Sequence, residues 1–143
     1  MKSMNIISRC QAIYRAQRLD SDLCACHHSL VLAICRAPGR SQDELAKDIC
    51  LNKSTVTRAL AQLEERGYVT RTPDASDKRR TLVEPTGKML DILPEVRAIT
   101  AEWNSAISAD IPADELAVFQ SVLKKMEQNA RNIIQKAEDN AEK

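Results

Sequence analysis

Glycine and aromatic residues are scarce in this sequence, and no long apolar run occurs. Three glycines and 3% aromatic residues among 143 residues disfavour β-sandwiches and barrels, which need many turns and many β-branched or aromatic strand residues. The longest apolar stretches, such as residues 30–35, are far shorter than the roughly 18 residues of a membrane span. No basic and then apolar segment precedes a cleavage-like site. We therefore expect a mainly helical, cytoplasmic protein with no membrane partner.

Excess charge of one sign is also missing, because the formal net charge is only +1. Residues 53–80, however, contain seven basic and only four acidic residues, and Lys78, Arg79 and Arg80 are adjacent. A local basic feature on a nearly neutral chain is typical of a protein that contacts phosphates at one place.

The cysteines do not predict a disulfide framework. They are five, an odd number, in a chain without a recognisable secretion signal. We expect most of them to be small apolar core residues.

Four helical patterns cover the first half of the chain. Residues 4–18 are amphipathic, and a second pattern over residues 28–37 ends at Pro38-Gly39. Ser41 and Glu44 have the spacing of a capping box at the start of a helix that runs to about residue 49. Asn52 is an N-cap for a helix that ends near Gly67, whose backbone favours a left-handed stop. Two short helices so close together predict a helix-turn-helix.

The outer face of the second of these helices is rich in small or hydrogen-bonding residues, which can enter a DNA groove. They are Lys53, Ser54, Thr55, Thr57, Arg58, Ala61 and Gln62. Two strand-like segments follow, residues 68–72 and 80–84, on either side of a polar turn. We expect them to form a β-hairpin with a basic tip, a wing.

The second half of the chain predicts two long helices. The first begins at Thr86 and contains Pro94, which we expect to kink it near residues 91–93 or to divide it in two. Pro112 opens the last helix, whose apolar stripe from Leu116 to Ala137 is too long for one small domain to cover. That stripe predicts dimerisation.

Several motifs occur in a fixed order within residues 28–88. They are Ser41-Gln42-Asp43-Glu44-Leu45-Ala46, Asn52-Lys53-Ser54-Thr55-Val56-Thr57-Arg58-Ala59-Leu60, Leu63-Glu64-Glu65-Arg66-Gly67-Tyr68-Val69 and Asp77-Lys78-Arg79. This ordered set resembles the winged helix-turn-helix core of the MarR family of bacterial transcription regulators. The flanking helices resemble the family's dimerisation region in length and position.

The resemblance implies a mainly α fold with a small β-wing. It implies a single domain over residues 1–143, with a DNA-binding core at 28–88 and dimerisation helices at 1–20 and 89–143. It further implies a homodimer that binds a palindromic operator in double-stranded DNA. Such a protein is usually a repressor, released by a small molecule, a metal or an oxidant.

The resemblance also assigns roles to individual residues. Ser54, Thr55, Thr57 and Arg58 take the places that meet bases and phosphates, Arg79 that of a wing-tip arginine in the minor groove, and Asp77 that of the acid that orients it. An arginine fork is attracted to a narrow minor groove. The full set of expected DNA-binding residues is Ser41, Gln42, Lys53, Ser54, Thr55, Thr57, Arg58, Gln62, Asp77, Lys78, Arg79 and Arg80.

The stretch Cys24-Ala25-Cys26-His27-His28 is open to three interpretations. Its thiols and imidazoles could bind zinc, copper or haem iron, the two cysteines could be a redox switch, or the segment could be an ordinary, partly buried helix start. In MarR proteins this segment borders the effector pocket. Cys10 and Tyr14, one helical turn apart, are further candidates for that pocket or for a sensor.

No required cofactor is predicted, and catalysis is disfavoured. Neighbouring Cys and His side chains are rarely aligned for catalysis, and the sequence has no phosphate-loop, oxyanion-loop or cofactor motif. The alternative to a DNA-binding protein is a helical, dimeric interaction protein that does not read DNA.

Overall fold

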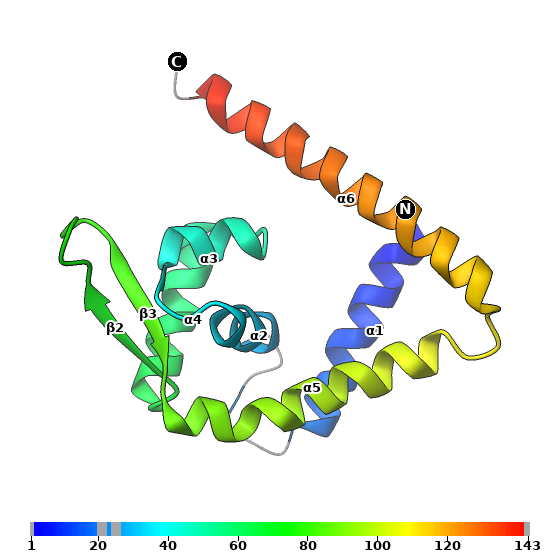
Figure 1. Cartoon of the computed structure of the whole chain (residues 1–143), viewed down its shortest axis with the longest axis horizontal. Helices are drawn as coiled ribbons and strands as arrows, with labels where there is room; N and C mark the ends of the chain where they lie inside the picture. Colours follow the sequence, from blue (N-terminus) through cyan, green and yellow to red (C-terminus); the bar gives the residue numbers. More distant parts are fainter. Residues whose placement is uncertain (1, 20–22, 24–26, 142–143) are drawn as a thin grey trace. The chain divides into compact units, whose positions relative to one another are not determined.

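The computed structural model describes residues 2–19, 23 and 27–141, in two compact units, Met1–Trp103 and Asn104–Lys143. The elements, shown in Figure 1, are α1 (Lys2–Arg18), α2 (His28–Arg36), β1 (Arg40–Ser41), α3 (Gln42–Asp48), α4 (Lys53–Glu65), β2 (Val69–Pro73), β3 (Thr81–Pro85), α5 (Gly87–Ile107) and α6 (Ala113–Ala141). A mostly helical chain with one small antiparallel sheet confirms the predicted fold class. None of the helices in these residues is long and apolar enough to cross a membrane.

The core of the first unit lies where α2, α3 and α4 meet the sheet and the first half of α5. Leu30 of α2, Leu45 of α3 and Leu60 of α4 are fully buried, as is Met89 of α5. Buried positions recur every three or four residues along α2 and α4, which gives each of these two helices one apolar face. The opposite face of α4 therefore stays exposed to solvent.

Local signals in the sequence set the helix ends. The Ser41 hydroxyl accepts a hydrogen bond from the Glu44 amide, and the Glu44 carboxylate accepts one from the Ser41 amide, so the predicted capping box is confirmed. Asn52 Oδ1 accepts from the Thr55 amide at 2.8 Å and caps α4. At the other end of α4, Gly67 has a φ of +76°, which confirms the left-handed stop.

The wing is the hairpin of β2 and β3, and it projects from the helices in Figure 1. The strand order is β1-β3-β2, and Val83 of β3 pairs with Arg71 on one side and Arg40 on the other. Both hairpin strands start and end one residue later than we expected. The two-residue strand β1 was not predicted, because two residues carry no periodic pattern.

One of the two alternatives expected for Pro94 was wrong. Pro94 does not divide the helix, since α5 is continuous from Gly87 to Ile107. Pro94 is exposed, whereas Met89, Val96 and Ile99 on the same helix are buried. The carbonyl that loses its partner thus faces water, and core packing on both sides of the proline keeps the helix intact.

The cysteines follow the prediction only in part. Among those described, Cys10 and Cys50 are exposed and are not core residues, whereas Cys35 is half-buried and packs against the core. Cys24 and Cys26 lie outside the described residues.

The helices expected to dimerise expose their apolar side chains. None of the described residues of α1 is buried, and Ile6, Ile7 and Ile13 are 47–59% exposed. The exposed apolar residues of α6 are Val118, Phe119, Val122, Met126, Ile133 and Ile134. The C-terminal end of α1 contacts α5 through an Arg18–Glu102 ion pair and a Tyr14–Trp103 ring contact.

Candidate nucleic-acid interface

Helix α4 presents a polar face formed by its N-terminal half. Val56, Leu60 and Leu63 are fully buried. Lys53, Ser54, Thr57 and Arg58 are exposed, whereas Thr55 is half-buried. The Thr57 hydroxyl donates to the Lys53 carbonyl at 2.8 Å, which leaves its methyl group free to contact a partner.

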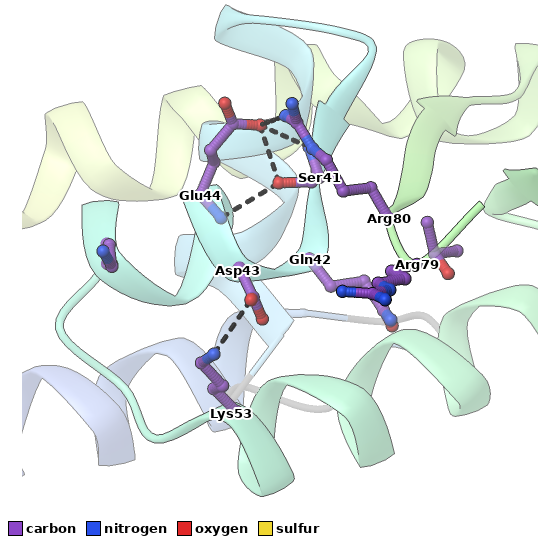
Figure 2. Close-up of a pocket in the computed structure, with 9 residues that line it drawn as sticks. Ser41, Gln42, Asp43, Glu44, Lys53, Arg79 and Arg80 are labelled. Atoms are coloured by element: carbon purple, nitrogen blue, oxygen red, sulfur yellow. Dashed lines mark hydrogen bonds and ion pairs between the residues drawn. The ribbon is translucent and has the colours of Figure 1, made fainter. Parts of the chain in front are cut away.

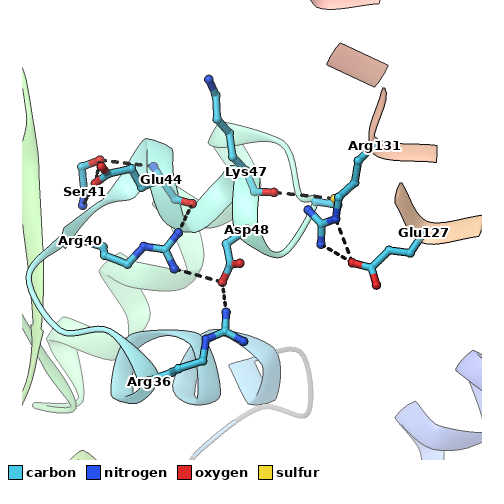
Figure 3. Close-up of polar contacts among 9 residues, drawn as sticks. Arg36, Arg40, Ser41, Glu44, Lys47, Asp48, Glu127 and Arg131 are labelled. Carbon is cyan, nitrogen blue, oxygen red and sulfur yellow. Dashed lines mark hydrogen bonds and ion pairs between the residues drawn. The ribbon is translucent and has the colours of Figure 1, made fainter. Parts of the chain in front are cut away.

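Helix α3 is held against α4 and β1 by ion pairs. Lys53 Nζ lies 2.9 Å from Asp43 Oδ2, which joins the first turn of α4 to the first turn of α3. On the other side, the Asp48 carboxylate accepts from Arg40 Nη1 at 3.2 Å and is also paired with Arg36 (Figure 3). Arg40 donates a second bond to the Glu44 carbonyl. These contacts join α3 to α4 on one side and to β1 and α2 on the other.

The wing tip carries the basic residues that we singled out. Asp77 Oδ1 accepts from the Arg79 amide at 3.0 Å. The carboxylate thus shapes the backbone turn, whereas we expected it to orient the Arg79 guanidinium. Arg80 Nη2 lies 3.0 Å from Glu44 Oε2, so Arg80 links the wing to α3. The bonds from Ser41 are the main cause of the lowered pKa of Glu44, and Arg80 adds to it.

An open hollow of about 300 Å³ lies between the wing and the two helices (Figure 2). Its lining consists of Ser41, Gln42, Asp43, Glu44, Lys47, Lys53, Arg79, Arg80 and Thr81. Four of these nine side chains are basic and two are acidic. Two acid–base pairs lie inside the hollow, Lys53–Asp43 and Arg80–Glu44, and the other two basic residues of its lining are Lys47 and Arg79.

Several of the expected DNA-binding side chains are engaged in the protein itself, and Ser41 and Gln62 are the two whose engagement bears most on their predicted role. Ser41 is only 4% exposed, and its hydroxyl donates to Glu44 Oε2 at 2.7 Å, so it caps α3 and does not face outward. Gln62 Oε1 lies 3.0 Å from His27 Nε2, which commits this amide to the start of α2. The capping box at Ser41 could be predicted from the spacing along the sequence, whereas the contact of Gln62 with His27 joins separate elements and could not.

Arg58, Lys78 and Arg79 differ from their neighbours in having no ion pair or side-chain hydrogen bond with the residues that the structure describes. Arg58 lies on the exposed face of α4, and the other two lie on the wing tip. Three exposed cations therefore lie on two elements, α4 and the wing.

Arg71 is a residue of this region that sequence reasoning missed. Its Nε and Nη2 donate to Glu64 Oε2 at 2.9 and 2.6 Å, and its Nη1 lies 3.4 Å from Gln42 Oε1. Hydrogen bonding to Arg71 is the main reason that the pKa of Glu64 is lowered. The sequence shows only a single arginine in a predicted strand, and that does not indicate which residues it contacts.

A second group of sequence-predicted residues lies at the start of α2. His27 and His28 are 0% and 1% exposed, and burial lowers the pKa of both. Burial, together with the charge of Arg15, brings the pKa of His28 to about 4. Neither ring nitrogen of His28, nor Nδ1 of His27, nor Nε of Arg15 has a hydrogen-bond partner among the described residues.

The remaining candidates for an effector site lie on α1. The Tyr14 ring centroid is 5.3 Å from that of Trp103, and the Arg18 guanidinium carbon lies 4.9 Å above the Tyr14 ring. Cys10 is exposed. No cluster of three or more His, Cys, Asp or Glu side chains suited to a metal ion occurs among the described residues, from which Cys24 and Cys26 are absent.

A short helix, a tight turn, a second helix with a polar outer face and a basic hairpin define a winged helix-turn-helix, the architecture of a large class of transcription regulators. Residues 27–81 match the sequence model of the MarR family. This match confirms the resemblance found in the sequence of the winged helix-turn-helix core.

Solved structures give the same result over almost the whole chain. The protein in the crystal structure of MarR is 27% identical in sequence to this chain, and the two structures match with a TM-score of 0.83 over 94% of this chain and 92% of that one. A MarR protein from Peptoclostridium difficile is 25% identical, with a TM-score of 0.87 over 92% and 86%. A MarR-family transcriptional regulator from Listeria monocytogenes, complexed with a 26mer DNA, is 20% identical and has the same fold, with a TM-score of 0.86 over 92% and 88%.

Proposed function

We propose that this chain is a sequence-specific, DNA-binding transcription regulator. The observation that carries the proposal is the set of solvated cations on two projecting elements, Arg58 on α4 and Lys78 and Arg79 on the wing tip. Small polar residues such as Ser54 and Thr57 let α4 enter the major groove, with Arg58 at bases or phosphates. Arg79 is suited to the negative potential of the minor groove. The Listeria relative in complex with DNA supports this assignment.

The regulator acts as a homodimer in this proposal. Helices α1 and α6 expose more large apolar side chains than a soluble monomer normally presents to water. A second copy would cover them, so residues 1–20 and 89–143 form the dimerisation region around a DNA-binding core at 28–88. Two-fold symmetry of the protein requires a palindromic operator, with half-sites about 10 bp apart from centre to centre.

Repression that is relieved by a signal is the third part of the proposal. Buried polar atoms without partners are rare in folded proteins, because each costs about 1–3 kcal/mol. The unpartnered nitrogens of His27, His28 and Arg15 support a polar effector that binds beside α1 and supplies the missing partners. If the signal is a metal or an oxidant, Cys24 and Cys26 would bind the metal or be oxidised. The protein requires no cofactor in this proposal.

Selection from a random 30-bp duplex library, with the purified protein as bait, tests the DNA-binding proposal. We expect an inverted repeat to be enriched, and a variant with both Arg58→Ala and Arg79→Ala to retain the dimer but lose the DNA. Recovery of no common sequence by a folded dimer would instead support an interaction protein without DNA readout.

The signal is tested on the selected duplex. It is titrated with zinc, copper, haem, peroxide and a panel of phenolic acids. Release by a metal or oxidant that Cys24→Ser or Cys26→Ser abolishes identifies a cysteine sensor. Release by an organic anion that His28→Leu abolishes identifies the buried nitrogens as the effector site. If neither class releases the DNA, the proposed relief of repression is wrong.

A further inference from the structure

Arg71 occupies the middle of β2, at the point where the wing leaves the helices. It is paired with Val83 of the central strand β3. Side chains alternate along a strand, so Arg71 lies on the same face as Val69, which is 2% exposed and part of the core. The Arg71 side chain is accordingly only 23% exposed, unlike those of the wing tip.

The contacts of Arg71 connect the wing to both helices of the helix-turn-helix. One carboxylate oxygen of Glu64, on α4, accepts from two guanidinium nitrogens, and the other accepts from the Arg71 amide at 3.1 Å. The remaining terminal nitrogen reaches Gln42, the first residue of α3. A planar fork with several bonded donors resists rotation more than a single-point ion pair does.

Beyond this point the hairpin is joined to the helix-turn-helix by the pairing of Leu82 with Ser41 of β1 and by the ion pair of Arg80. Arg80 is paired with Glu44, but these side chains are 44% and 48% exposed, so solvent weakens their attraction. The turn itself is held by internal hydrogen bonds, such as those from the Ser76 amide to Asp74 Oδ1 and from the Asp74 amide to the Arg80 carbonyl. The direction of the wing therefore depends on the pairing of β3 with β1 along one strand and on the contacts of Arg71 along the other.

The wing acts as a lever about this residue. Asp74 lies three residues beyond Arg71, which is about 10 Å along an extended strand. A rotation of about 10° at Arg71 would thus move the tip by about 2 Å, whereas N–H···O hydrogen bonds tolerate only about 0.5 Å in length. Arg79 would miss a phosphate or groove that it meets in the anchored position.

We propose that Arg71 is a positioning residue for DNA binding: its contacts with Glu64 and Gln42 hold the wing at the angle at which Arg79 and α4 engage the same duplex. The proposal rests on the proposed DNA-binding function. It assigns Arg71 no contact with DNA.

A double-mutant cycle on the affinity for the selected duplex, at one salt concentration, tests the proposal. Arg71→Met and Arg79→Ala are each expected to weaken binding about tenfold, and the double variant should be hardly weaker than either single variant. Once the wing is misdirected, Arg79 no longer contacts the DNA, so its removal causes no further loss of affinity. Independent effects, about hundredfold in the double variant, would overturn the proposal, as would unchanged affinity in Arg71→Met.

Two further variants keep the result interpretable. Glu64→Gln weakens the same junction from the α4 side and keeps an acceptor for the Arg71 amide, so it should show the same non-additivity with Arg79→Ala even if Arg71→Met folds poorly. Arg18→Met removes a more exposed ion pair far from the wing, between α1 and α5, with an Arg18–Glu102 distance of 2.9 Å, and should be additive with Arg79→Ala. Thermal unfolding of every variant checks the fold.

The two proposals fail in different ways. A wild-type protein that selects no duplex refutes the proposed function. A wild-type protein that binds its duplex, with additive effects at Arg71 and Arg79, refutes only the positioning role.

Discussion

The protonation of His28 gives the protein a stability that depends on pH. The pKa of this side chain is lowered from an ordinary 6.5 to about 4, because burial disfavours the charged ring and Arg15 adds a nearby positive charge. In the unfolded chain the imidazole takes up a proton as the pH falls below 6.5, whereas in the folded protein it stays neutral until about pH 4. Acidification through this interval therefore favours unfolding.

The size of the effect follows from the two pKa values. Between pH 7 and pH 5, preferential protonation of the unfolded state removes about 2 kcal/mol from the free energy of unfolding. His28→Leu, which replaces a ring without polar partners by an apolar side chain of similar size, removes this contribution and should be no less stable than wild type at pH 7.

Urea denaturation followed by far-UV circular dichroism measures the difference at pH 7, 6 and 5, at equal protomer concentration. We expect wild type to lose about 2 kcal/mol more than His28→Leu between pH 7 and pH 5. His27 is present in both proteins, and the lowered pKa values of Glu44, Glu64 and Asp74 act mainly below pH 5, so these groups cancel. Parallel profiles for the two proteins would show that His28 is not held neutral by the fold.

Three other predictions concern the interface and one helix end. Arg58→Ala should weaken binding of the selected duplex by about 1–3 kcal/mol at fixed salt, as measured by fluorescence anisotropy. The plot of log affinity against log salt should have a slope of about −5 for the wild-type dimer, and Arg79→Ala should make it shallower by about 2. Cys50→Gly should raise the free energy of unfolding by about 0.5–1 kcal/mol, because φ of Cys50 is +52°; no gain in urea denaturation would argue against strain there.

Local signals made most of the fold predictable. The capping box at Ser41, the N-cap at Asn52 and the stop at Gly67 each act within four or five residues, so the sequence alone located α3 and α4 closely. Cys50 shows the limit of this reasoning. It closes α3 in the left-handed conformation, with the Leu51 amide bonded to the Ala46 carbonyl at 3.1 Å, although no glycine marks the position.

Contacts between elements were not predictable in the same way. The pairing of Arg71 with Glu64 and of Gln62 with His27 joins residues whose meeting depends on tertiary packing. An exposed position on a helical wheel therefore predicted Gln62 as a groove contact, although its amide carbonyl is already engaged. The continuity of α5 through Pro94 is likewise a tertiary effect, set by buried residues on both sides of the proline.

The distribution of charge shows why counting basic residues overstates the DNA contact. Residues 53–80 contain seven basic side chains, which would give a dimer a salt slope of about −13 if every one met a phosphate. Lys53, Arg71 and Arg80 are paired with carboxylates, and Arg66 also has an interaction partner in the protein. Only Arg58, Lys78 and Arg79 remain, which for two protomers gives six contacts and a slope near −5. The paired arginines shape the interface, and because each is already neutralised by an acid of the same chain, they add little to the release of counterions from DNA.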